Sequence, residues 1–246
     1  MKSNLLRLLR RIQSAVADWM AESPSTRDPK LFVYMWRNYS FIKALGIGLY
    51  DEVFYGEILQ AESAYADLAS VIRSVLKPTS VCDFGCGNGF IVYYLKQGGV
   101  AVKGVESSTS ARQYMPIEVK EDILTASVVK PLSLGKFDVT VSMEVAEHIS
   151  KAKAKMLIRN LAEHASSGIV FTAASPGQWG DGHINCQPKS YWQALFLEYG
   201  WRPNEDLRKK IVSEIRERPQ IDQLIPWISK NVMIFTRSSD RTASAN

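Results

Sequence analysis

Residues 81–90, VCDFGCGNGF, constrain the fold more than any other stretch of the chain. A short apolar run passes into three glycines at alternate positions, Gly85, Gly87 and Gly89. Such a run is typical of a buried strand, and closely spaced glycines allow backbone conformations that bring a ligand close to the main chain. The stretch therefore predicts a strand that enters a ligand-binding turn.

Strand-like and helical segments alternate over most of the chain. The strand-like segments are short and mostly apolar, whereas the helical ones repeat apolar residues three and four positions apart. This alternation predicts an α/β fold, a parallel sheet with helices on both faces. The expected strands are residues 80–85, 100–107, 117–124, 136–145, 167–175 and 231–237, and the expected helices include residues 56–76, 89–97 and 147–165.

The charge is unevenly distributed along the 246 residues. The net charge is +5; residues 1–50 hold 8 Lys and Arg against 3 Asp and Glu, and the remainder holds 22 of each kind. Because residues 51–246 carry no excess of basic side chains, the sequence predicts no DNA partner and argues against an RNA partner. The three cysteines form no CxxC pair, which predicts free thiols in a reducing cytoplasm rather than disulfides or a zinc site.

The N-terminal region reads as an appendage to the main domain. Apolar residues recur at helical spacing over residues 5–20, which predicts an amphipathic helix that packs on its own domain, on a partner in a homodimer, or on an anionic membrane surface. No secretory signal or membrane-spanning run is recognisable. We expect an N-terminal helical extension over residues 1–54, the main domain over residues 55–238, and a disordered tail over residues 239–246.

The glycine turn excludes two common nucleotide sites. The dinucleotide fingerprint needs a glycine where Phe90 stands, and no lysine follows the glycines as it would in a triphosphate loop. Asp83, at the end of its strand, would repel a pyrophosphate but attract an ammonium group. Glu106 lies 21 residues after Gly85, at a spacing suited to ribose hydroxyls. These features favour S-adenosylmethionine, which carries an ammonium group and a ribose but no phosphate.

At this point the chain resembles the class I S-adenosylmethionine-dependent methyltransferases. The motifs VCDFGCGNGF, GVESS, EDI and FDVTVSMEVAEHI are similar to the successive motifs of that class over roughly residues 55–175. The resemblance implies a doubly wound, mostly parallel, seven-stranded Rossmann-like sheet whose last strand, NVMIFTR, is antiparallel. It implies that Asp83 and the glycines hold the methionine end, Glu106 the ribose, and Asp122 and Ile123 the adenine. The expected cofactor-binding residues are Asp83, Gly85, Cys86, Gly87, Glu106, Ser107, Asp122, Ile123, Met143 and Glu144.

Three polar residues follow the fourth expected strand. A helix beginning there would place Glu144, Glu147 and His148 on one face. They would then cap and orient the cofactor loop, act as a general base, or hold Mg²⁺ or Mn²⁺. The pattern resembles the metal-holding segment of ubiquinone-pathway O-methyltransferases and small-RNA end methyltransferases, and the alternatives stay open.

Residues 175–192 form a glycine-rich loop after the fifth expected strand. His183 in this loop is a candidate catalytic base or metal neighbour, or else a histidine bonded to Asn185 or to a carbonyl. Trp179, Asn185, Gln187 and Tyr50 are candidates for holding an acceptor. The aromatic residues 30–55 predict a lid, in which Tyr50, Tyr55 and Trp36 shield the sulfonium, or else an aromatic helical core.

These features predict methyl transfer to a hydroxyl of a small molecule or saccharide, with His183, His148 and Glu147 as the catalytic residues. Two alternatives remain: an RNA or protein methyltransferase, and a catalytically silent scaffold of the same fold. No tetrapeptide of the N-P-P-Y kind follows the fourth strand, which disfavours methylation of nucleobase amino groups.

Overall fold

The computed structural model describes residue 50 and residues 52–178, 180 and 182–237. The predicted amphipathic helix, Trp36, Trp179 and the tail 239–246 lie outside these residues, so the expectations about them and the domain boundaries stay predictions. Within the described part of the chain, no helix combines the length and the apolar character needed to cross a membrane.

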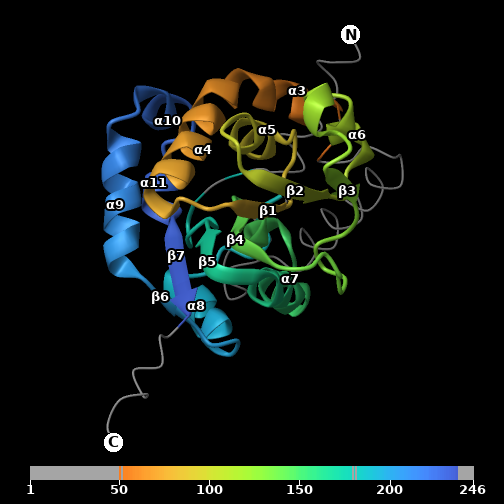
Figure 1. Cartoon of the computed structure of the whole chain (residues 1–246). Coiled ribbons are helices and arrows are strands. Elements are labelled where there is room, and N and C mark those ends of the chain that lie inside the picture. The colour runs from red at the N-terminus through yellow and green to blue at the C-terminus, as the bar shows by residue number, and fades with distance from the viewer. Residues whose placement is uncertain (1–49, 51, 179, 181, 238–246) are drawn as a thin grey trace, which may run out of the picture.

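A seven-stranded sheet forms the centre of the fold (Figure 1). Its order is β3-β2-β1-β4-β5-β7-β6. All neighbouring pairs are parallel except those that β7 makes with β5 and β6, so β7 alone runs against the others. This confirms the predicted doubly wound sheet. The strands are β1 Ser80–Phe84, β2 Ala101–Glu106, β3 Ile123–Thr125, β4 Phe137–Ser142, β5 Ala165–Phe171, β6 Trp201–Pro203 and β7 Met233–Arg237.

Helices cover both faces of the sheet, as Figure 1 shows. One face packs against α4 Glu62–Leu76, α5 Phe90–Gln97, α9 Glu205–Arg216 and α10 Pro219–Leu224, and the other against α7 Lys151–His164 and α8 Lys189–Leu197. Short elements complete the described chain: α3 Glu52–Ile58, η2 Leu59–Ala61, α6 Thr109–Arg112, η3 Ile117–Val119, η4 Ala146–His148 and α11 Ile228–Asn231.

Helix α4 shows how the sequence pattern produces this packing. Its buried residues include Ala64, Leu68, Val71 and Ile72, whose three- and four-residue spacing gives one apolar face toward the sheet. Lys77 ends the helix in the left-handed region, with φ 49°, immediately before Pro78. Proline disfavours helical backbone in the residue before it, so the chain turns here into β1.

Three sequence expectations need correction. Residues 117–124 are not one strand: a 3-10 turn occupies Ile117–Val119, and β3 starts only at Ile123. The turn follows Pro116 and buries Val119 completely, so the apolar residues of this segment do not alternate as in a strand. The helix expected at 147–165 begins at Lys151, after a separate 3-10 turn over Ala146–His148, and the sequence pattern gave no sign of β6.

Candidate active site

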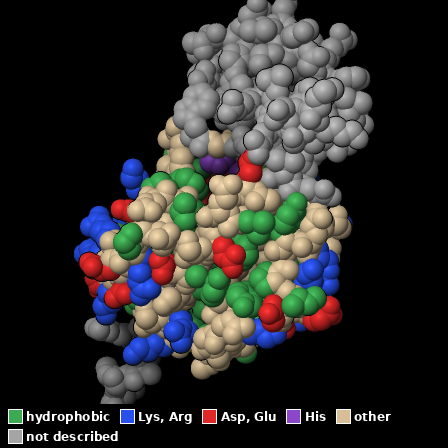
Figure 2. All heavy atoms as spheres, turned by 90° about the horizontal axis from the view of Figure 1, so that it is seen from above, with side chains coloured by type: hydrophobic (Ala, Val, Ile, Leu, Met, Phe, Trp, Pro, Cys, Tyr) green, Lys and Arg blue, Asp and Glu red, His purple; other side chains and the backbone are tan. Residues whose placement is uncertain are grey.

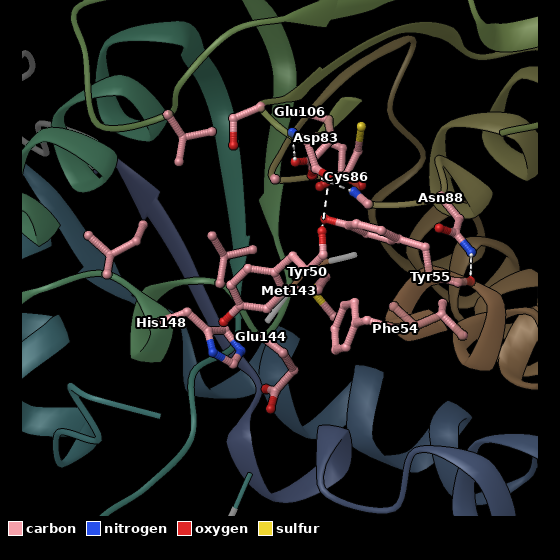
Figure 3. Close-up of a pocket in the computed structure, with 18 of the residues that line it drawn as sticks. Tyr50, Phe54, Tyr55, Asp83, Cys86, Asn88, Glu106, Met143, Glu144 and His148 are labelled. Carbon is pink, nitrogen blue, oxygen red and sulfur yellow. Dashed lines mark hydrogen bonds between the residues drawn. The ribbon is translucent and has the colours of Figure 1, made fainter. Parts of the chain in front are cut away.

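A cavity of about 700 Å³ opens at the carboxyl edge of the parallel strands. The segments that follow β1, β2 and β4 form its floor, since the carboxyl ends of parallel strands meet at one edge of a sheet. Tyr50 and α3 cover the cavity from one side, and residues 127–129 form another wall. Trp227, just before α11, also lines it. Figure 3 shows the labelled side chains converging on this space from separate elements.

Asp83 lies on the cavity wall near the end of β1. It is only 3% exposed, and its Oδ1 atom has no hydrogen-bond partner within the described structure. Burial, with a further contribution from the nearby Glu106 carboxylate, raises the pKa of Asp83 to about 8. A buried polar atom without a partner is costly. A bound cation would therefore stabilise the ionised form of this carboxyl group and satisfy the free oxygen.

The glycine turn needs its glycines for two physical reasons. Gly85 has φ +83°, in the left-handed region, and a Cβ atom there would lie 2.6 Å from Cγ2 of Val145. Gly89, with φ +72°, would bring a Cβ atom to 2.8 Å from Cδ1 of Ile123. Any side chain at either position would meet backbone strain and an apolar neighbour at once. The turn therefore presents bare backbone to the cavity.

Glu106 ends β2 and connects the turn to the next loop. Its Oε2 atom accepts a hydrogen bond from the Gly87 amide at 2.9 Å, and its Oε1 atom accepts one from the Ser108 amide at 2.7 Å. The carboxylate is thereby fixed in one orientation on the cavity wall. The expected residues Cys86 and Ser107 line the same wall.

Helix α3 is fastened to the glycine turn through Asn88. The Nδ2 atom of Asn88 donates to the Tyr55 carbonyl at 2.9 Å, as the dashed line in Figure 3 shows. Because the amide nitrogen is used in this way, Oδ1 is identified as the acceptor. That atom is buried and has no partner in the described structure, although Asn88 lines the cavity. Asn88 Oδ1 is therefore a second buried hydrogen-bond acceptor without a partner, in addition to Asp83 Oδ1.

The residues expected at the adenine do not reach the cavity. Asp122 precedes β3 rather than ending it, and it forms an ion pair with Lys96 at 2.7 Å. Ile123 packs in the apolar cluster beneath the turn. The strand lies further along the chain than the sequence pattern predicted, so its carboxyl end delivers Ser127, Val128 and Val129 to the cavity instead. This corrects the placement of Asp122 and Ile123.

Helix α7 holds this replacement wall in position. Asn160 donates from Nδ2 to the carbonyls of Val128 and Lys130, both at 2.8 Å, and accepts from the Leu132 amide at 3.3 Å. His164 accepts from the Leu134 amide at 3.2 Å. The loop after β3 therefore takes its shape from side chains on a helix some 30 residues later.

Met143 and Glu144 follow β4 and line the cavity, as expected. Glu144 has φ +53°, in the left-handed region, which is uncommon for a residue with a side chain. Its amide donates to Oγ1 of Thr172 at 2.8 Å, and both of its carboxylate oxygens accept from Nδ2 of Asn231, at 3.1 and 3.3 Å. The residue is thus held from two sides.

Three potential ligand or base atoms gather beside Glu144. One atom each from Glu147, His148 and His183 lies within 4.8 Å of the others. Glu147 is fully buried; its Oε1 atom accepts from the Ala174 amide at 3.1 Å, while Oε2 has no partner among the described residues. The Nδ1 atom of His148 is likewise buried and unpartnered there. Glu144, which the sequence grouped with this set, is not among the three.

The protonation of this cluster follows from burial. Burial raises the pKa of Glu147, and the nearby Glu144 raises it further. Burial lowers the pKa of His148 to about 4, with His183 as the second cause, so its imidazole is neutral at pH 7. His183 places Nδ1 3.1 Å from the Gln178 carbonyl, which can only accept. The Nδ1–H tautomer is therefore favoured, and Nε2 keeps a free lone pair.

The backbone of Glu147 brings His183 into the site. The Glu147 carbonyl accepts from the amides of Ile184 and Asn185, both at 2.9 Å. The rings of His148 and His183 meet edge to face with centroids 4.9 Å apart, and Tyr50 packs on the other side of His148 at 5.5 Å. Tyr50 lines the cavity, as expected for an acceptor-contacting residue.

The other expected acceptor residues have different positions. Asn185 is 2% exposed; its Nδ2 donates to the Ala146 carbonyl at 3.4 Å and its Oδ1 accepts from Gln187. Neither Asn185 nor Gln187 lines the cavity. They brace the loop on η4, so their expected contact with an acceptor is corrected to a supporting role, whereas Trp179 lies outside the described residues.

Sequence reasoning missed several residues that line the cavity. Tyr65 of α4, Gln178 and Trp227 are among them. Tyr65 falls on a helix whose pattern predicts only a packed face, and Trp227 belongs to a short segment without regular periodicity. Asn88 also lines the cavity, and its place between Gly87 and Gly89 of the glycine turn is a sequence feature from which this position could have been predicted.

The comparisons with known proteins agree with this architecture. Residues 82–168 match the model of a family described as a methyltransferase domain. No curated protein sequence matches the chain. Many solved structures resemble it, though at low sequence identity.

Three of these structures illustrate the range of sequence identity and structural similarity. CalS10, described as an amino pentose methyltransferase from Micromonospora echinaspora, is 11% identical, with a TM-score of 0.54 over 72% of this chain and 92% of that one. DesVI of Streptomyces venezuelae is 16% identical, with a TM-score of 0.49 over 58% and 85% of the two chains. The magnesium protoporphyrin IX methyltransferase of Synechocystis is 18% identical, with a TM-score of 0.47 over 74% and 90%.

The family match spans β1 to β5, which contain the glycine turn, Glu106 and the Glu147–His148 segment. The likeness to CalS10 concerns the fold alone. With this domain at its centre and a sheet of this order around it, the chain has the fold of the class I S-adenosylmethionine-dependent methyltransferases.

Proposed function

We propose that the chain transfers the methyl group of S-adenosylmethionine to a hydroxyl group of a small molecule or saccharide. The observation that carries this proposal is the position of Glu147, His148 and His183. His148 and His183 line the same cavity as Asp83, the glycine turn and Glu106, and the fully buried Glu147 has an atom within 4.8 Å of theirs. One cavity thus combines a recognition end for a cationic cofactor with two imidazoles that can accept a proton.

The cofactor residues divide the ligand between them. Asp83, with its unpartnered Oδ1, takes the ammonium group, and its carboxyl group ionises when that cation binds. Glu106, fixed by two backbone amides, accepts from the ribose hydroxyls. The wall of residues 127–129 covers the adenine in the place first expected for Asp122 and Ile123.

The acceptor hydroxyl lies between the sulfonium and His183. Its oxygen attacks the methyl carbon in line as the carbon–sulfur bond breaks, which leaves S-adenosylhomocysteine as a neutral thioether. Nε2 of His183 takes the hydroxyl proton, and Gln178 holds the ring in the tautomer that can do so. Glu147 stabilises the loop by its contacts with Ala174, Ile184 and Asn185.

The same three residues also fit a divalent cation. The free Oε2 of Glu147 and the free Nδ1 of His148, both buried, are the unpartnered atoms that ligation would satisfy, and His183 completes the set. Two imidazoles and one carboxylate suit Mn²⁺ better than Mg²⁺, which prefers oxygen ligands. A cation bound there would lower the pKa of the acceptor hydroxyl.

The test begins with calorimetric titration of S-adenosylhomocysteine, with and without Mn²⁺ or Mg²⁺, and with NAD as the control ligand. We expect micromolar binding of S-adenosylhomocysteine and none of NAD. Transfer of labelled methyl groups is then measured with panels of sugars, phenols and amines. His183→Ala should retain cofactor binding and lose turnover. Absence of S-adenosylhomocysteine binding would overturn the proposal, and transfer to amines alone would overturn the hydroxyl assignment.

A further inference from the structure

A second hollow lies between α9 and α11, outside the cofactor cavity. It measures about 500 Å³. Figure 1 shows the two helices next to each other at one end of the sheet. Its walls are Arg208, Lys209, Val212, Ser213 and Arg216 of α9, with Ser229 and Lys230 of α11. The α9 residues are spaced so that they share one face of that helix. We call this hollow the α9–α11 groove.

The α9–α11 groove concentrates positive charge. Four of its seven lining side chains are cationic and none is acidic. Over residues 51–246 as a whole, groove included, basic and acidic residues balance at 22 each, and Figure 2 shows them interspersed over the face in view. Arg208 is paired with Glu205 at 2.6 Å, but Lys209, Arg216 and Lys230 form no ion pair with any described residue. Three cations therefore face the groove without a counter-charge.

A neighbouring lysine experiences this field. Nζ of Lys189 lies 3.5 Å from the Val232 carbonyl, just after α11. Its pKa is lowered, first by burial and then by the charge of Arg208, while Glu205, the ion-pair partner of Arg208, acts in the opposite direction. The argument for an anion therefore depends on the cations that line the groove without an ion pair.

Helix α11 joins the groove to the cofactor cavity. Trp227 lines the cavity and Lys230 lines the groove, and the Lys230 amide donates to the Trp227 carbonyl at 3.1 Å. Residues three apart on a helical turn have neighbouring side chains, about 5–6 Å between Cβ atoms. At the end of the same turn, Asn231 holds Glu144 inside the cavity. Residues of one helical turn therefore line both hollows.

From this juxtaposition we propose that the α9–α11 groove binds the phosphate group of the methyl acceptor. The acceptor is then a phosphate-bearing small molecule, such as a sugar phosphate or a nucleotide-linked sugar, whose hydroxyl end enters the cavity past Trp227. Lysine and arginine side chains and the hydroxyl of Ser213 are groups that bind phosphate oxygens, whereas the Ser229 hydroxyl donates to the Pro226 carbonyl. This inference rests on the proposed function, because it names the acceptor class of that reaction.

The experiment uses inorganic pyrophosphate as the probe, titrated into the full chain saturated with S-adenosylhomocysteine. The test variant combines Lys209→Gln, Arg216→Gln and Lys230→Gln. The control combines Lys77→Gln, Lys151→Gln and Lys153→Gln, which remove three exposed cations that line neither hollow. We expect at least tenfold weaker pyrophosphate binding in the test variant and less than a twofold change in the control. Both variants should bind S-adenosylhomocysteine like the original chain.

The outcomes separate this inference from the proposed function. Normal S-adenosylhomocysteine binding with no pyrophosphate binding at millimolar concentration, or with equal loss in both variants, overturns the phosphate site and leaves the methyltransferase proposal standing. A second arm measures cosedimentation with phosphatidylglycerol vesicles. Groove-dependent vesicle binding without pyrophosphate binding would overturn the assignment to a soluble acceptor. Loss of S-adenosylhomocysteine binding in the original chain would overturn the proposed function itself.

Discussion

Asn160 offers a sharp test of how the cavity wall is built. It is 1% exposed on α7 and makes three hydrogen bonds to the backbone of residues 128–132. Leucine has a similar volume but forms none of these bonds. Asn160→Leu should therefore leave α7 in place while the carbonyls of Val128 and Lys130 and the amide of Leu132 lose their partners.

The magnitude follows from the bonds that are lost. At about 1 kcal/mol for each hydrogen bond, the substitution should cost about 3 kcal/mol of unfolding free energy, unless the loop moves outward to water. In a chain of this length such a loss lowers the melting temperature by about 6 to 12 °C. If about 1.4 kcal/mol is needed on binding to re-form the wall, the affinity for S-adenosylhomocysteine falls about tenfold.

Thermal unfolding, hydrogen exchange of residues 127–134 and calorimetric titration test these values together. Lys153→Leu serves as the control, since that residue is exposed on the same helix and should change the unfolding free energy by less than about 0.5 kcal/mol. Faster exchange confined to residues 127–134, together with weaker binding, is the expected result. An Asn160→Leu protein with unchanged stability, exchange and affinity would refute the reasoning.

Three further predictions concern the cofactor end of the cavity. The folded-state pKa of Asp83 is raised to about 8 from 3.8, so the folded protein holds this proton more tightly than the unfolded chain, and the stability that this group contributes falls as the pH rises from about 4 through 8. Binding of an ammonium group favours the ionised form of Asp83, so the affinity for S-adenosylhomocysteine should rise between pH 6 and 7.5, and binding should release a proton. Calorimetry in two buffers measures both effects. An affinity that does not change with pH would exclude Asp83 as the partner of the ammonium group. Gly85→Ala should abolish binding, since φ +83° and a 2.6 Å approach to Val145 combine, and adding Val145→Ala should restore part of it by removing the contact but not the strain. Asn88→Leu should weaken S-adenosylhomocysteine binding more than binding of 5′-methylthioadenosine, which lacks the amino-acid end, if the free Oδ1 faces that end; equal losses for the two ligands would contradict this.

The grouping of Asp83, the glycine turn and Glu106 on one cavity wall could be predicted from the sequence, whereas their roles in cofactor binding stay a proposal. Asp83 and Glu106 end or nearly end neighbouring parallel strands, and strand pairing alone brings them together. The same logic misplaced Asp122. The alternation of IEVKEDIL predicted a strand where the chain forms a 3-10 turn, so β3 begins several residues later than expected. A strand end is a good predictor of position only when the strand itself is located to within a residue or two.

The position of His183 beside Glu147 and His148 was less predictable because long-range contacts produce it. His183 stands 35 residues after His148 in the sequence, in a loop whose path depends on the bonds from Ile184 and Asn185 to the Glu147 carbonyl. No local pattern specifies such a pairing. The sequence could identify His183 as a candidate, but not that it would join Glu147 and His148 in place of Glu144.

A left-handed backbone torsion accompanies the different partners of Glu144 and Glu147, although Glu144 stays close enough to raise the pKa of Glu147. Regular helical backbone would have continued from Glu144 to Glu147, but Glu144 has φ +53°, and the 3-10 turn η4 begins only at Ala146. Glu144 then faces Asn231, and Glu147 turns inward to Ala174 and the histidines. A left-handed conformation in a residue with a side chain costs of order 1 kcal/mol or more and persists only where its surroundings enforce it. Here the bonds to Thr172 and Asn231 do so, which makes α11 a structural support of the cavity as well as one wall of the α9–α11 groove.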